Sequence, residues 1–316
     1  MATIERDLPA TTLHFADPHV TADGSERAYV RLTALETLWF NTGTLCNLTC
    51  SHCYIESSPT NDRLAYITAN EVAAFLDEIR SQELPTREIG LTGGEPFMNP
   101  DIAIILDEAL SRGLDVLVLT NAMTPMRHHR STLTRLRENY GRALALRVSL
   151  DHYTRERHET ERGPLTWDRT LDGLKWLAQG GFNVAVAART LWGDQEPALR
   201  QGFADLFRAH GIEIDAQDPT RLVVFPEMDA TAPVPEITTA CWSILDVNPD
   251  AMMCATSRMV VKRKDAAAPA VVACTLLPYD QQFELGNTLA EGADEVRLNH
   301  PHCAKFCVLG GGSCGA

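Results

Sequence analysis

Hydrophobic and polar positions alternate between strand-like and helix-like patterns along most of the chain. The largely apolar run from Leu35 to Phe40 is typical of a buried strand. Thr68 and Glu71 follow it and predict a capping box at the start of a helix. The next apolar residues recur at helical spacing and give that helix one buried face: Val72, Phe75, Leu76 and Ile79.

The same alternation continues as far as residue 225. It predicts strands at 88–92, 115–120, 144–150, 183–188 and 221–225, and helices at 101–112, 130–140, 167–179 and 197–210. Six strands alternating with five helices indicate an α/β fold with a parallel sheet and helical crossovers.

The two ends of the chain follow a different pattern. Residues 1–34 are polar without clear periodicity and are expected to form an N-terminal extension. Residues 229–240 carry two prolines and suit a linker, which places a domain boundary near residue 232. Beyond it, 260–264 and 270–275 predict a short β-hairpin. The expected organisation is therefore an extension (1–34), an α/β domain (35–231) and a small cysteine-rich domain (232–316).

Composition and charge narrow the class of protein. The 316 residues are 45% hydrophobic, and no apolar run approaches a membrane-spanning length, so we expect a soluble protein without a membrane partner. Lysine and arginine total 28 against 42 acidic residues, and the net charge of -14 disfavours nucleic acid as a partner. Nine cysteines without an apolar export signal point to a reducing compartment, the cytoplasm.

Three of these cysteines fall in the stretch CNLTCSHCY at residues 46–54. Buried packing or a disulfide are the ordinary explanations, but the intervening residues are mostly polar and the compartment is reducing. Clustered cysteines in such a protein more often bind metal or carry out redox chemistry. Cys46, Cys50 and Cys53 can hold three corners of an iron-sulfur cube and leave the fourth iron open.

A second group of polar and glycine-rich positions follows the other predicted strands. Gly93-Gly94-Glu95-Pro96 comes after the second strand, and Asn121, Asp151 and Arg189 come after later ones. Arg189 and Glu227 are weaker candidates for facing a substrate. In parallel α/β folds this edge of the sheet binds ligands. Two glycines and a proline also form tight turns without any ligand.

The CxxxCxxC loop and the Gly-Gly-Glu-Pro turn together resemble the radical S-adenosylmethionine superfamily over residues 35–226. The resemblance implies a partial (β/α)6 TIM-like barrel and a 4Fe-4S cluster held by Cys46, Cys50 and Cys53. It also implies that S-adenosylmethionine chelates the open iron. One electron then cleaves its sulfonium bond, and the resulting 5′-deoxyadenosyl radical abstracts a hydrogen atom from a substrate.

The resemblance also implies contacts to S-adenosylmethionine, although it names no further catalytic residue. The positions that match the family's cofactor-binding motifs are Gly93, Gly94, Glu95, Pro96, Tyr54, Asn121, Ser149 and Arg162. Two of them have simpler explanations: Asn121 is a residue type that forms turns, and Arg162 is equally typical of a solvent-exposed position at the start of a helix. His152 stands where the family's Ser-Leu-Asp-Gly stretch has its glycine.

The C-terminal cysteines resemble the auxiliary-cluster extensions called SPASM and twitch domains. Cys254, a hairpin, Cys274, Leu285-Gly286-Asn287 and a closing set of Cys303, Cys307 and Cys314 follow in the order of that pattern. The resemblance implies one auxiliary 4Fe-4S cluster, with Cys254, Cys274, Cys303 and Cys307 as favoured ligands and Cys314 as their competitor. A zinc site is the alternative, and buried packing is expected for Cys241.

The function expected is hydrogen abstraction from a small molecule or a peptide, with electrons from a reductase, flavodoxin or ferredoxin. The 34 residues before the first strand are too few for a peptide-recognition domain, which favours a small molecule or short peptide. Two alternatives stay open: an enzyme resembling the molybdenum cofactor cyclases, and a non-catalytic iron-sulfur protein for sensing or electron transfer.

Overall fold

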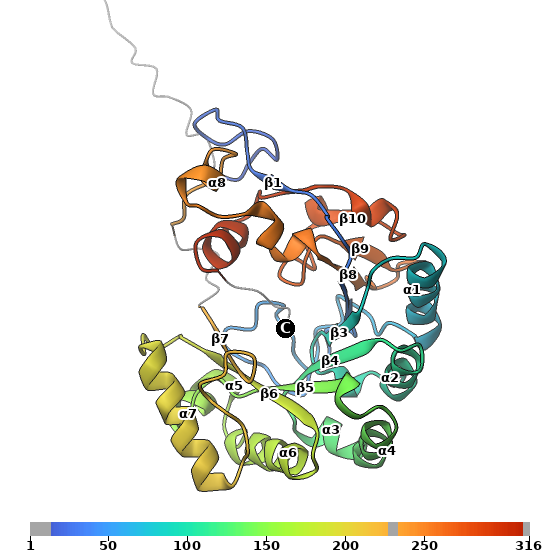
Figure 1. Ribbon diagram of the computed structural model, residues 1–316, viewed down its shortest axis with the longest axis vertical. Coiled ribbons are helices and arrows are strands. Elements are labelled where there is room, and N and C mark those ends of the chain that lie inside the picture. The colour runs from blue at the N-terminus through green and yellow to red at the C-terminus, as the bar shows by residue number, and fades with distance from the viewer. Residues whose placement is uncertain (1–13, 227–232, 312–316) are drawn as a thin grey trace, which may run out of the picture.

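The computed structural model describes residues 14–226 and 233–311, and its centre is one mixed β-sheet (Figure 1). Six neighbouring strands run parallel: β2 (Thr37–Asn41), β3 (Glu88–Thr92), β4 (Asp115–Thr120), β5 (Leu144–Ser149), β6 (Asn183–Arg189) and β7 (Leu222–Phe225). They pair in chain order, and β7 is one edge of the sheet. The predicted α/β fold with a parallel sheet is therefore confirmed as an open, partial barrel.

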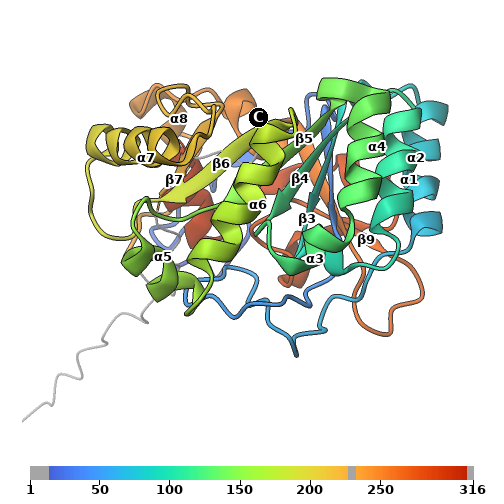
Figure 2. The same cartoon turned by 90° about the horizontal axis from the view of Figure 1, so that it is seen from below.

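Helices connect these strands and cover the outer face of the sheet (Figure 2). The longer ones are α1 (Ala69–Ser81), α2 (Ile102–Ser111), α4 (Arg130–Tyr140), α6 (Trp167–Gln179) and α7 (Glu196–His210). The predicted capping box is present at the start of α1. The Thr68 side chain accepts a hydrogen bond from the Glu71 backbone N–H, and the Glu71 side chain accepts one from the Thr68 backbone N–H. The apolar faces of these helices pack against the outward-facing residues of the strands and form the main hydrophobic core.

Trp39, the middle residue of β2, is buried on the face of the sheet opposite the main core. Its indole lies against Gly90 on the neighbouring strand, where a Cβ atom would come within 2.3 Å of the ring. Gly90 is therefore needed for this close approach. Trp39 packs with Leu117 and Met259 in a hydrophobic cluster separate from the main core.

The C-terminal segment extends the same sheet instead of standing apart from it. Strand β8 (Ser257–Val261) pairs parallel to β2, and β9 (Ala270–Val272) and β10 (Glu284–Gly286) follow in antiparallel order. The predicted hairpin is thus present, with β8 beginning three residues earlier than expected. The linker at 229–240 is described only from residue 233, and the boundary near 232 lies outside the described residues.

The N-terminal arm packs on this C-terminal segment from residue 14 onwards. Strand β1 (Tyr29–Val30) pairs with β11 (Val296–Arg297). Arg27 is fully buried, and its guanidinium pairs with Glu236 at 2.5 Å. The sequence predicted an N-terminal extension here but not this pairing, because the polar residues 1–34 carry no signal for partners almost 270 positions away.

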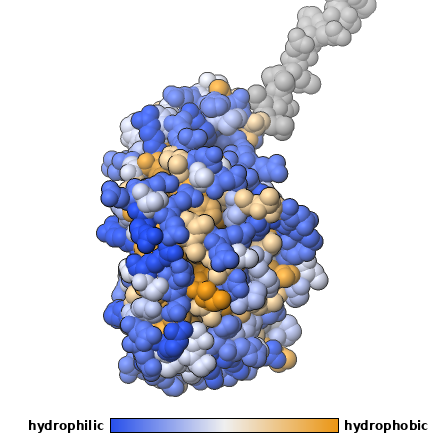
Figure 3. Space-filling model, turned by 90° about the vertical axis from the view of Figure 1, so that its right-hand side faces the viewer, coloured by the Kyte–Doolittle hydropathy of each residue, from blue (hydrophilic) through white to orange (hydrophobic). Residues whose placement is uncertain are grey.

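Several short elements complete the chain. They are α3 (Thr124–His128), α5 (Arg155–Arg162), α8 (Cys241–Ile244), a π-helix (Cys303–Val308), and 3-10 turns at Pro96–Met98, Gly141–Ala143, Pro249–Ala251, Met253–Ala255, Gln281–Phe283 and Glu291–Ala293. Hydrophilic side chains dominate the face of the molecule shown in Figure 3. Among the described residues, none of the helices combines the length and the apolar character that crossing a bilayer requires.

Candidate active site

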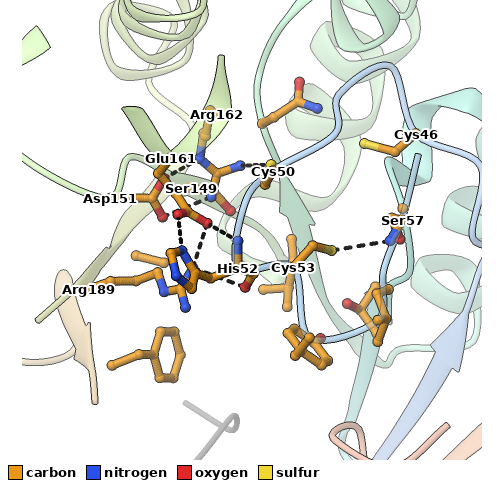
Figure 4. A pocket seen from close by; sticks show the side chains of 18 of the residues that line it. Cys46, Cys50, His52, Cys53, Ser57, Ser149, Asp151, Glu161, Arg162 and Arg189 are labelled. Carbon is orange, nitrogen blue, oxygen red and sulfur yellow. Dashed lines mark hydrogen bonds and ion pairs between the residues drawn. The ribbon is translucent and has the colours of Figure 1, made fainter. Parts of the chain in front are cut away.

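A cavity of about 170 Å³ opens at the carboxyl ends of the parallel strands, between the barrel and the C-terminal segment. All three cysteines of the 46–54 loop line it (Figure 4). The barrel contributes polar groups from the ends of β3, β4 and β5, while the C-terminal segment contributes Leu276 and Phe306. Parallel α/β folds bind their ligands at this edge, so this cavity is the candidate active site.

The three cysteines are free thiols, and each has a hydrogen-bond donor near its sulfur atom. The backbone N–H of Leu48 lies 3.4 Å from Sγ of Cys46, and that of Ser57 lies 3.3 Å from Sγ of Cys53. Nη1 of Arg162 lies 4.0 Å from Sγ of Cys50. Donors that face sulfur in this way favour the thiolates that an iron-sulfur cluster requires.

Burial acts in the opposite direction on the thiols of Cys46 and Cys50. Desolvation raises the pKa of the Cys46 thiol to about 12, and it also raises the pKa of Cys50, although Arg162 partly offsets this. A metal centre at these cysteines would supply positive charge that favours their deprotonated form. In the described residues, His, Cys, Asp and Glu side chains do not gather in threes around a point suited to a single metal ion.

The Gly93-Gly94 turn packs directly against the cysteine loop. The Gly94 N–H donates to the carbonyl of Gly43 at 2.8 Å, and the Glu95 N–H donates to that of Leu45 at 3.2 Å. A Cβ atom on Gly94 would lie 2.1 Å from the Leu45 carbonyl oxygen, and Gly93 has a φ of +137°. Both positions therefore require glycine if the turn is to hold the loop at this distance.

Glu95 lies beneath the turn and outside the cavity wall. Its carboxylate accepts hydrogen bonds from Thr120 Oγ1 at 2.8 Å and from the Asn121 N–H at 2.9 Å. Burial raises the pKa of Glu95 to about 7. The carboxylate thus joins the ends of β3 and β4, while Pro96 begins the 3-10 turn below it. Of the four residues in this motif, only Gly93 and Gly94 line the cavity.

The other four predicted cofactor contacts all line the cavity: Tyr54, Asn121, Ser149 and Arg162. The Asn121 side chain also donates to Asn47 at 2.9 Å, so it ties the end of β4 to the cysteine loop. Arg162 makes a bidentate ion pair with Asp151, which is almost fully buried. Although burial of Asp151 acts in the other direction, Arg162 keeps the pKa of this carboxyl below its usual value.

Sequence reasoning missed several residues at the cavity, including the apolar Phe225, Leu276 and Phe306, and the charged Glu161. The buried carboxylate of Glu161 contacts His52 and Arg189, which places it beside the cysteine loop (Figure 4). Glu161 stands in the highly charged segment RERHETER, which has no apolar periodicity. Its only sequence signal is that it precedes Arg162. Arg189 lines the cavity as expected for a strand-end residue, and Glu227 lies outside the described residues.

A second, smaller cavity of about 20 Å³ lies within the C-terminal segment. Four cysteines contribute to its apolar wall: Cys254, Cys274, Cys303 and Cys307. Burial raises the pKa of Cys254 to about 11, and burial together with the other three thiols raises that of Cys303 well above its usual value. The Cys241 sulfur instead lies 3.4 Å from the Thr238 backbone nitrogen, and Cys314 lies outside the described residues.

Two segments of the C-terminal part of the chain contribute residues to both cavities. Leu276 stands two residues after Cys274 and faces the first cavity, and Phe306 precedes Cys307 and does the same. The Phe306 ring stacks on Phe225 from β7 with 6.2 Å between centroids. Apolar side chains close in sequence to Cys274 and Cys307 therefore line the cavity that holds the cysteine loop.

The fold and this cavity define a class of protein: an open α/β barrel with three cysteine thiols at the carboxyl ends of its strands. Residues 40–197, half of the chain, match the family model described as the radical SAM superfamily. The chain belongs to this superfamily and is an enzyme. The predicted membership in this superfamily is thereby confirmed.

Curated relatives match the same part of the chain. The subtilosin biosynthesis protein AlbA of Bacillus subtilis, named for an antilisterial bacteriocin, is 34% identical over 143 residues. That match covers 45% of this chain and 30% of AlbA. The AdoMet-dependent heme synthase of Methanosarcina barkeri is 33% identical over 153 residues, or 46% of this chain and 41% of the synthase. The matches therefore span less than half the length of these relatives.

Solved structures share the fold at low identity. Streptococcus suis SuiB bound to the precursor peptide SuiA aligns with a TM-score of 0.59 and 12% identity, covering 84% of this chain and 66% of SuiB. The native enzyme anSMEcpe with bound AdoMet aligns with a TM-score of 0.57 and 13% identity, covering 85% of this chain and 82% of anSMEcpe. At this level of identity, the likeness is one of fold.

Proposed function

We propose that this enzyme uses a 4Fe-4S cluster and S-adenosylmethionine to abstract a hydrogen atom from an organic substrate. The observation that carries the proposal is that Cys46, Cys50 and Cys53 share one cavity with the Gly93-Gly94 turn. Three thiols with donors at each sulfur fit the three protein ligands of a cluster whose fourth iron is open. When both groups are bound, they supply a one-electron cleavage that yields a carbon radical able to take hydrogen.

The residues around the cysteines suit the polar parts of S-adenosylmethionine. The backbone of Gly93 and Gly94 faces the cavity beside the cysteine loop, where an amino acid moiety has room. Asn121 and Ser149 offer hydrogen-bonding groups from the neighbouring strand ends, and Tyr54 offers an aromatic face. In this proposal Arg162 balances negative charge beside Cys50, and Glu95 positions the turn from below.

The opposite wall suits an apolar part of the substrate. Phe225, Leu276 and Phe306 line the cavity with carbon-rich side chains, which would help to exclude water from a bound substrate. Exclusion of water protects a reactive radical from side reactions. The relatives are named for a bacteriocin and for heme, which supports a peptide or a small molecule as the substrate. A reductase, flavodoxin or ferredoxin would supply the electron.

We further propose that the second cavity holds one auxiliary 4Fe-4S cluster through Cys254, Cys274, Cys303 and Cys307. Four cysteine side chains around one apolar cavity support this assignment. Because Leu276 and Phe306 stand next to these ligands and also line the first cavity, the cluster would lie across a single layer of side chains from the substrate. Such a cluster would either accept an electron from the substrate or bind the substrate directly. The eight cysteines among the described residues form no disulfide with one another, which suits the reducing cytoplasm.

The test is reductive cleavage of S-adenosylmethionine by anaerobically reconstituted protein. Reduced wild-type protein should release 5′-deoxyadenosine and methionine, and Cys50→Ala or Cys53→Ala should reduce this release to background. Cys241→Ala serves as the matched cysteine control, because this thiol lies outside both cavities, and it should retain the activity. Background levels of 5′-deoxyadenosine from wild-type protein with a full complement of iron and sulfide would exclude the proposal.

A further inference from the structure

We infer that Glu161 is a positioning residue that fixes the segment between Cys50 and Cys53 and sets the electrostatic environment of the cluster. This inference rests on the proposed function, because it assumes a cluster at these cysteines. Glu161 is the penultimate residue of α5, and its side chain is only 2% exposed. It stands 109 positions from the loop that it contacts.

Three donors converge on the Glu161 carboxylate. The His52 backbone N–H donates to Oε1 at 2.9 Å, and Nδ1 of the His52 ring lies 2.7 Å from Oε2. Nη1 of Arg189, from the end of β6, donates to Oε1 at 2.9 Å and to the His52 carbonyl at 3.2 Å. One carboxylate thereby holds both the backbone and the side chain of the residue that precedes Cys53.

The backbone of the same helix end fastens the residue that follows Cys50. The Ser51 N–H donates to the Glu161 carbonyl at 2.9 Å, and the Ser51 hydroxyl donates to the Thr160 carbonyl at 3.3 Å. The entire link between Cys50 and Cys53 is thus bound to the last turn of α5. Outer contacts that orient ligands in this way govern how firmly a metal centre is held.

The charges at this clamp, formed by Glu161, His52 and Arg189, also bear on the reduction of a cluster. Reduction adds a negative charge, so a buried carboxylate nearby opposes it and a buried guanidinium favours it. Arg189 is 12% exposed and Glu161 is 2% exposed, and solvent therefore screens them only weakly. Removing the charge of either Glu161 or Arg189 should therefore shift the reduction potential of the cluster, and the sign of the charge that remains sets the direction.

Two substitutions with opposite expected signs test the inference in the reconstituted full-length protein. Glu161→Gln removes the negative charge and should shift the reduction potential to more positive values. Arg189→Gln leaves the carboxylate uncompensated and should shift it to more negative values. The potential is read by an EPR-monitored redox titration, and the signal that changes on addition of S-adenosylmethionine identifies the cluster at Cys46, Cys50 and Cys53.

A second measurement tests the mechanical part of the clamp. Glu161→Ala should release iron to a chelator at least threefold faster than wild-type protein, because the link between Cys50 and Cys53 loses its anchor. Glu156→Gln is the matched control, since Glu156 lies on the exposed side of the same helix, and it should change neither potential nor release rate.

Unchanged potentials in both charge variants, together with an unchanged release rate in Glu161→Ala, would overturn the inference. Shifts of the same sign in Glu161→Gln and Arg189→Gln would also overturn it, because a loosened loop and not charge would then be the cause. Failure of the proposed function has a different signature: wild-type protein would form no 5′-deoxyadenosine, whatever the variants do to iron release and potential.

Discussion

Arg162 places its Nη1 atom 4.0 Å from Sγ of Cys50 while its other guanidinium nitrogens hold Asp151. One buried cation thus serves both the cysteine loop and the end of β5. Asp151 is 1% exposed and Arg162 is 14% exposed, so neither charge can turn to solvent if its partner is removed. A substitution of this arginine should therefore affect both the stability of the fold and the candidate active site.

The first prediction concerns the free energy of unfolding at this ion pair. Arg162→Gln should destabilise the cluster-free protein by about 3 kcal/mol, because it leaves a buried carboxylate without its counter-charge. Adding Asp151→Asn should recover at least about 1 kcal/mol, since the uncompensated charge is then removed. Urea unfolding of the two single variants and the double variant measures this coupling. Strictly additive losses would show that the two side chains do not depend on each other.

The second prediction tests the close approach of the glycine turn to the cysteine loop. Gly94→Ala would place a Cβ atom 2.1 Å from the Leu45 carbonyl oxygen, which is backbone and cannot move aside cheaply. We expect a loss of about 3 kcal/mol in unfolding free energy and a loss of iron from the cysteine loop. Urea unfolding and iron analysis after reconstitution measure both effects.

Gly113→Ala is the control for this substitution. Gly113 has open space around its Cβ position and a φ of +83°, so alanine there meets backbone strain without a collision. It should cost about 1 kcal/mol and leave the iron content unchanged. Equal effects of the two substitutions would mean that the contact between the turn and the loop is unimportant.

The third prediction concerns the C-terminal cysteines. Cys254→Ala and Cys303→Ala should each lower the iron content from about eight to about four atoms per chain, because one of two 4Fe-4S clusters is lost. Reductive cleavage of S-adenosylmethionine should continue, since Cys46, Cys50 and Cys53 are intact. Iron and sulfide analysis with the 5′-deoxyadenosine assay provides both readings. Four iron atoms per wild-type chain, or zinc in place of iron, would contradict the auxiliary cluster.

The fourth prediction is a pH dependence that arises from His158. This side chain is fully buried, and neither ring nitrogen has a hydrogen-bond partner among the described residues. Burial, together with the nearby Arg162, lowers its pKa to about 3 in the folded protein, whereas the ordinary value is 6.5. Between these values the unfolded chain binds the extra proton, so the free energy of unfolding falls as the pH drops below about 6.5.

At pH 5 this linkage amounts to about 2 kcal/mol for one histidine. His158→Leu should therefore lose less stability than the wild-type protein between pH 7 and pH 5, by about 1 to 2 kcal/mol, in urea unfolding of cluster-free protein. The same substitution at the exposed His128 should leave the pH dependence unchanged. Parallel losses in wild-type protein and His158→Leu would rule out this histidine as the source.

Local signals in the sequence determined the parallel sheet and the central parts of the site. The strands at 88–92 and 115–120 and the helices at 130–140 and 167–179 lie where the apolar periodicity predicted them. Each is amphipathic or continuously apolar, and the information that fixes it lies within the element itself. The cysteine loop and the Gly93-Gly94 turn were equally visible, because their chemistry depends on residue types at short spacing.

Tertiary structure alone decided which distant residues meet. The polar helix α5 gave no periodic signal, and it buries only His158 and Glu161. The contact between Glu161 and His52, the pairing of the N-terminal arm with β11, and the position of Glu95 beneath the turn all depend on packing between segments far apart in the chain. Such contacts carry no local pattern, because each side chain is fixed by a partner that only the folded chain brings near.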